Sequence, residues 1–70
     1  MMPMKNNGLS NMDKEIIVAF AKYDMRAFRA AKHIFVSKGT IVYHAEKIKK
    51  KTGLDMRKFY DLCKLLEMVK

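Results

Sequence analysis

Apolar side chains recur every three or four residues along most of the chain, and polar residues occupy the positions between them. This spacing places the apolar side chains on one face of a helix. It predicts four helices, at about residues 12–22, 24–34, 38–51 and 56–68. The segment "TIVYH" is rich in β-branched residues, but it keeps helical spacing, and no stretch alternates with period two for long enough to predict a strand.

Helix ends are marked by residues with suitable capping chemistry. Candidate N-caps precede the four predicted helices: Ser10, Asp24, Ser37 and Asp55. Asp13 lies three residues after Ser10, close to a capping box. Gly53 suits the end of the third helix, because glycine adopts the left-handed conformation that closes helices. Residues 1–9 have no periodicity and predict a disordered leader before a single domain at 10–70.

The apolar positions also predict which side chains form the core. The predicted faces are Ile16, Ile17, Phe20 and Tyr23, then Ala27, Phe28, Ala31 and Ile34, then Ile41, Ala45 and Ile48, and finally Met56, Phe59, Leu62, Cys63, Leu66 and Val69. Cys63 is therefore predicted to be a packed thiol. Tyr60, Leu65 and Met68 lie off the last stripe and predict a homodimer through the fourth or first helix. The alternative is ordinary exposed apolar surface at a chain end.

Charge is concentrated in the middle of the chain. The 70 residues hold 15 Lys and Arg against 7 Asp and Glu, a net charge of +8. Residues 25–54 contain a single acid, Glu46, and eight basic residues: Arg26, Arg29, Lys32, Lys38, Lys47, Lys49, Lys50 and Lys51. A basic segment of this kind is typical of a nucleic-acid interface. The alternative is a solvated surface whose lysines keep the protein in solution.

A short connection at about residues 35–37 joins the second predicted helix to the basic third one. Five apolar residues would pack inside this corner: Ala31, Ile34, Val36, Ile41 and Ile48. Such a corner predicts an all-α, homeodomain-like or Fis-like helix-turn-helix of about four helices. The helix at 38–51 would then enter the major groove of double-stranded DNA as the recognition helix.

The outer face of this helix supplies the candidate DNA contacts. We expect groove contacts from Lys38, Tyr43 and Lys47, and phosphate contacts from Arg26, Arg29, Lys50 and Lys51. Gly39 would allow close approach of the DNA backbone. Thr40 would either contact DNA or brace the helix start. Tyr43 would alternatively be a half-buried hydrogen-bonding residue.

The motif "GTIVYHAEKI", followed by "TGLD", resembles the C-terminal helix-turn-helix domain of PucR/CdaR-type transcription regulators, with the similarity covering about residues 16–66. The matching positions are Ala31, Ile34, Val36, Thr40, Ile41, Tyr43, Ile48, Thr52, Gly53, Leu54 and Asp55. The resemblance implies sequence-specific duplex DNA binding in transcription regulation. The family's His-Arg-Asn is Ser37, Lys38 and Gly39 here, and its Arg after the Tyr is His44. These are base-reading positions, so Ser37 and His44 join the candidate DNA contacts, but because the residues differ the family's DNA specificity does not carry over.

Other classes of function lack the residues they need. There is no Ser/His/Asp, Cys/His or paired-carboxylate set, so we expect no enzyme activity and no cofactor. His33 and His44 lack further ligands at metal-binding spacing. The longest apolar run, "IIVAFA", is too short to span a membrane, and a single cysteine favours a reducing, cytoplasmic setting. Two alternatives remain: a degenerate helix-turn-helix serving as a protein-protein interaction or dimerisation module without DNA binding, and an RNA-binding domain.

Overall fold

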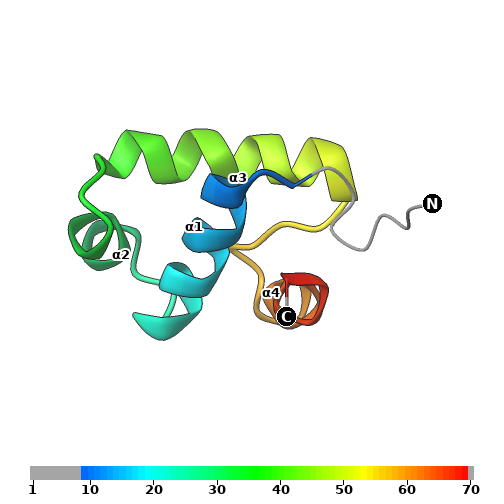
Figure 1. Ribbon diagram of the computed structural model, residues 1–70. Helices are drawn as coiled ribbons and strands as arrows, with labels where there is room; N and C mark the ends of the chain where they lie inside the picture. The colour runs from blue at the N-terminus through cyan, green and yellow to red at the C-terminus, as the bar shows by residue number, and fades with distance from the viewer. Residues whose placement is uncertain (1–8, 70) are drawn as a thin grey trace.

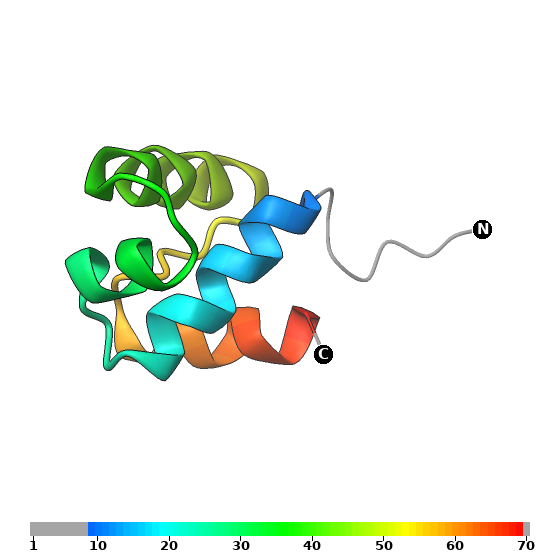
Figure 2. The same ribbon diagram turned by 60° about the vertical axis from the view of Figure 1, so that its left-hand side comes forward.

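The computed structural model describes residues 9–69, which form four helices and no strand. The helices are α1 (Asn11–Lys22), α2 (Ala27–His33), α3 (Lys38–Thr52) and α4 (Phe59–Val69). In Figure 1, α3 and α4 lie on opposite sides of the fold with α1 between them, and α2 lies beside the start of α3. Figure 2 shows the same order from a second direction. The predicted all-α fold with a helix-turn-helix-like arrangement is confirmed.

Local capping chemistry explains three of the helix ends. The Oγ of Ser10 accepts a hydrogen bond from the Asp13 amide at 3.1 Å, and Asp13 Oδ2 accepts one from the Ser10 amide at 3.0 Å, which completes a capping box. Ser37 caps α3 by accepting from the Thr40 amide at 3.1 Å. Gly53 closes α3 in the left-handed conformation, with φ at 78°. All three ends were predicted from the sequence.

The predicted starts of α2 and α4 were wrong. Asp24 and Met25 are both left-handed, with φ of 57° and 64°, so the chain turns sharply there and α2 begins only at Ala27. Asp55 caps a turn and not a helix, because its Oδ1 accepts from the Arg57 amide at 2.9 Å. Helix α4 consequently begins at Phe59. Asp24 thus lies within a turn and Asp55 stabilises one through its side chain, and aspartate occurs in turns as readily as at helix caps.

One hydrophobic core joins all four helices. Its buried residues are Leu9, Ile16, Ile17, Ala19, Phe20, Ala30, Ala31, Ile41, Ala45, Ile48, Met56, Leu62 and Leu65. Ile34 and Val36 pack against this cluster from the corner between α2 and α3, as predicted. Leu9, which the pattern assigns to the leader, is also part of the core. The rest of the predicted leader, residues 1–8, lies outside the described residues.

The predicted faces of α2 and α4 are correct at most positions, and they are wrong at Phe28, Phe59 and Cys63. Phe28 and Phe59 are each 62% exposed and Cys63 is exposed, whereas Leu65 is completely buried. Helix α4 contacts only α1 among the helices, and it does so through the face that holds Leu62 and Leu65. The fourth helix is apolar around much of its circumference, so its sequence is compatible with either orientation. The prediction of a packed Cys63 thiol was therefore wrong, and Leu65, which the pattern places off the buried stripe, belongs to the core.

Candidate nucleic-acid interface

The turn between α2 and α3 sets the position of the candidate recognition helix. The Val36 amide donates to the Ala31 carbonyl at 2.9 Å, and Phe35 adopts a left-handed conformation with φ at 59°. This reversal directs Ile34 and Val36 toward the core, while the Phe35 side chain is 94% exposed. Ile34 and Val36 thus face inward on either side of Phe35, and α2 and α3 are joined by a short connection.

The first turn of α3 is exposed, and a second hydroxyl group stabilises its N-cap residue. Ser37, Lys38 and Gly39 are exposed, and Thr40 is half-buried. The hydroxyls of Ser37 and Thr40 lie 3.0 Å apart, so Thr40 braces the cap, in line with the second of its two predicted roles. A helix N-terminus presents unpaired amide groups that attract phosphate, and Lys38 adds a positive charge beside them.

Three candidate contact residues lie together on the outer face of α3. Tyr43, Lys47 and Lys50 follow one another at spacings of four and three residues, which places them on one side of a helix. Tyr43 is 63% exposed, and the Nζ of Lys47 lies 6.0 Å from the centre of its ring. The alternative of a half-buried Tyr43 is therefore excluded. Lys50 is exposed and Lys47 is half-buried. This group is called the α3 face below.

His44 points toward α1 and away from the α3 face. Its Nδ1 lies 2.6 Å from Oδ1 of Asp13, a carboxylate with no exposed surface. An ionised carboxylate can only accept hydrogen bonds, so Nδ1 of His44 is the donor. Lys51 lies on the same side of α3, with its Nζ 3.9 Å from Oδ2 of Asp13. His44 and Lys51 were predicted to contact DNA, and the structure places both beside α1.

Several groups determine the ionisation of Asp13. Burial disfavours the charged form and would raise its pKa. The hydrogen bonds from the Ser10 amide and from His44, together with the charge of Lys47, outweigh burial, so the pKa of Asp13 lies below its usual value of 3.8. The carboxylate therefore remains charged at neutral pH and attracts the basic side of α3 toward the start of α1.

The two arginines predicted to contact phosphate belong to the start of α2. Arg26 is the N-cap residue of α2 and Arg29 lies in its first turn. Both side chains are exposed. They sit on a different element from the α3 face.

Arg57 carries no signal in the sequence that marks it as part of this interface. Its Nη2 donates to Oε2 of Glu46 at 3.0 Å, and its Nε donates to Oδ1 of Asp55 at 2.9 Å. The hydrogen bond to Asp55 and then the one to Glu46 raise the pKa of Arg57 above its usual value. The same contact with Arg57 lowers the pKa of Asp55. Glu46 is the single acidic residue of α3, and Arg57 offsets its charge. Eleven positions separate Glu46 from Arg57, so no local spacing could have predicted the pair.

Within the described part of the chain, no three His, Cys, Asp or Glu side chains are grouped so that they could hold a metal ion. None of the helices at residues 9–69 has both the length and the apolar character needed to cross a membrane.

Comparisons with models of protein families, with curated proteins and with solved structures find no significant match to this chain.

Proposed function

We propose that this chain binds duplex DNA by inserting α3 into the major groove and that it acts in transcription regulation. The observation that carries the proposal is the α3 face, with Tyr43, Lys47 and Lys50 on the exposed side of a helix held at a short corner. The resemblance of "GTIVYHAEKI" and "TGLD" to PucR/CdaR-type regulators supports the same function.

The distribution of charge over the fold favours this orientation on DNA. The segment from α2 through α3 contains one acid, Glu46, which Arg57 offsets. Its basic residues are Arg29, Lys32, Lys38, Lys47, Lys49, Lys50 and Lys51. Phosphate neutralisation by such residues releases counterions from DNA, which supplies affinity without sequence selectivity. Helix α4, on the far side of the fold, lacks this excess (Figure 1).

The proposed roles follow from where each side chain lies. Lys38 and the free amides of the first turn of α3 bind a phosphate, and Gly39 lets the backbone approach closely. Tyr43 and Lys47 reach into the groove, where Lys47 can donate to guanine O6 or N7. Phosphate contacts outside the groove come from Arg26, Arg29 and Lys50. His44 and Lys51 hold α3 against Asp13 and so set the angle at which the helix projects.

Fluorescence anisotropy with a random duplex at several salt concentrations tests the proposal. We expect a dissociation constant of roughly 10⁻⁴ to 10⁻⁶ M that weakens steeply as salt rises. Lys50→Ala should reduce the slope of log K against log salt by about 1. Lys64→Ala, which removes an exposed lysine from α4, is the matched control and should leave the slope unchanged.

Two outcomes would contradict DNA binding through α3. One is the absence of binding at low salt by a chain whose circular dichroism shows folded helices, which would favour the protein-interaction alternative. The other is an equal effect of Lys50→Ala and Lys64→Ala, which would indicate attraction by net charge without a defined face. If binding is confirmed, selection from a randomised duplex pool should enrich a sequence, and Lys47→Ala should weaken that enrichment.

A further inference from the structure

The surface formed by α1 and α4 has an exposed apolar strip with Val18 at its centre. Val18 is 48% exposed, in the middle of α1. On one side it borders a shallow groove of about 370 Å³, lined by Cys63, Leu66 and Val69 of α4. Helix α4, which supplies one side of this strip, lies across α1 from α3 (Figures 1 and 2).

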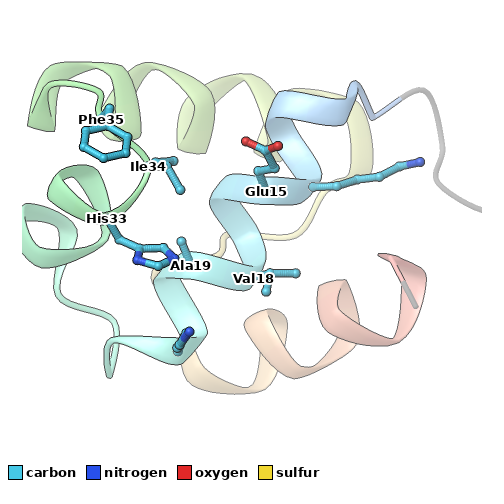
Figure 3. Close-up of a pocket in the computed structure, with 8 residues that line it drawn as sticks. Glu15, Val18, Ala19, His33, Ile34 and Phe35 are labelled. Atoms are coloured by element: carbon cyan, nitrogen blue, oxygen red, sulfur yellow. The ribbon is translucent and has the colours of Figure 1, made fainter.

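A second and larger groove lies on the other side of Val18. It measures about 620 Å³ and runs between α1 and the end of α2. Figure 3 shows Glu15, Val18 and Ala19 on its α1 side and His33, Ile34 and Phe35 across from them. Val18 lines both grooves and forms an apolar ridge between them. The ridge of another helix can pack into a groove beside it.

Charge indicates what can cover this surface. Apart from Asp13, which is buried against His44, helices α1 and α4 carry three carboxylates and three lysines, so their charges balance: Glu15, Asp61 and Glu67 against Lys14, Lys22 and Lys64. The protein as a whole has a net charge of +8, so two copies repel each other across most orientations. The α1 and α4 surface is the part of the described chain where two copies approach without that repulsion.

We propose that a second copy of this chain docks on the α1 and α4 surface, with α1 antiparallel to its counterpart and a two-fold axis beside Val18. In a two-fold contact each copy offers the same surface, so the ridge of one α1 lies against that of the other. The apolar strip of each copy, with Cys63 and Leu66, is then covered by its counterpart.

The positions of Glu15 and Lys22 specify this antiparallel arrangement. Glu15 lies three residues before Val18 and Lys22 lies four residues after it, and at about 100° per residue both fall on the same flank of α1. Both side chains are exposed and line the larger groove. The two-fold axis exchanges the two ends of α1, so each Glu15 meets Lys22 of the second copy. Such exposed pairs add little affinity but select one orientation.

Association through this surface is independent of DNA binding and is measured without DNA. Sedimentation equilibrium from about 10 µM to about 1 mM should show a reversible monomer-dimer equilibrium. Glu15→Lys and Lys22→Glu should each weaken association by roughly tenfold, since every dimer contains the contact twice. The double variant, which exchanges the two charges, should restore association to within about twofold of the original chain.

Lys32→Glu is the matched control, because it makes the same charge change on α2, outside both grooves around Val18. It should weaken association far less than Lys22→Glu does. Val18→Asp should abolish the dimer without loss of helix content, because Val18 is not part of the buried core. A strict monomer at about 1 mM would overturn the proposal. The proposal would also be overturned if the double variant associated no better than either single variant. In the antiparallel pairing, exchanging the two charges should restore association.

Discussion

The Nδ1–H of His44 donates to Oδ1 of Asp13 across 2.6 Å, and this contact links the first turn of α1 to the middle of α3. Asp13 also completes the capping box of α1 through its other oxygen, Oδ2. One buried carboxylate therefore caps the first helix and anchors the candidate recognition helix. The orientation of α3 depends on two residues that are 31 positions apart in the chain.

Replacement of His44 should destabilise the fold. His44→Ala leaves Oδ1 of a buried carboxylate without the imidazole donor, which we expect to lower the free energy of unfolding by roughly 1–3 kcal/mol. Urea denaturation followed by circular dichroism measures this loss. The matched control is His33→Ala, which breaks an exposed 3.0 Å contact with the Tyr23 hydroxyl and should cost about 0.5 kcal/mol. Equal losses for the two variants would show that the contact with Asp13 contributes nothing specific.

The lowered pKa of Asp13 makes stability depend on pH. Its folded-state pKa lies below 3.8, the value expected in the unfolded chain, so its contribution is fully present above that value. The contribution is lost as pH falls through 3.8 and then through the folded-state pKa. Asp13→Asn should therefore be less stable at pH 7 and should lose less stability than the original chain between about pH 4 and pH 2. Unfolding curves at several pH values test this, and parallel pH profiles for the two proteins would contradict it.

Replacing Gly53 and Gly39 with alanine should change the stability of the fold in opposite directions. Gly53 has φ at 78°, so Gly53→Ala should cost about 1–2 kcal/mol through backbone strain, although no atom lies within 4 Å of the added Cβ. Gly39 is helical, and its added Cβ would meet only Ser37 Oγ at an ordinary 3.7 Å. Gly39→Ala should therefore stabilise the helix by about 0.5–1 kcal/mol. Thermal unfolding separates the two cases, and a similar change at both positions would contradict the assigned conformations.

The exposure of Cys63 can be checked by thiol labelling. In the structure this thiol is exposed on α4, beside Leu66 and Val18. We therefore expect an aromatic disulfide reagent to modify it in the folded monomer within about tenfold of the rate in denaturant. A buried thiol would react only during unfolding. At concentrations where the chain associates, labelling should slow, because the proposed dimer covers this side of α4.

The helix ends that could be predicted from sequence depend on local chemistry. Ser10 and Asp13 close a capping box over three positions, Ser37 caps through Thr40, and Gly53 supplies a left-handed residue. Each of these involves neighbours in the chain, so residue types and spacing are sufficient. The starts of α2 and α4 were mispredicted, because Asp24 and Asp55 lie in turns whose conformation depends on how the next helix packs.

Some features of the candidate interface could likewise be predicted from local sequence, and others depend on contacts between distant residues. The outward direction of Tyr43 and Lys50 follows from the wheel of α3 once Ile41 and Ile48 define its buried side. The wheel also places His44 at the flank, but nothing in the sequence indicates that Asp13 is its partner. The contact between Arg57 and Glu46 also joins separate elements, over a shorter distance along the chain, and it changes the electrostatics of the outer face.

The sequence alone was sufficient to predict the number of helices, the corner between α2 and α3 and the basic character of that region, because helical periodicity and composition are local properties of the chain. The tertiary structure alone decided which side of α4 is buried and where His44 points. Leu65 and Cys63 are both apolar enough for a core position, and only the packing of α4 against α1 selects between them. A buried Asp13 likewise requires a donor, and the three-dimensional arrangement of α1 and α3 supplies His44.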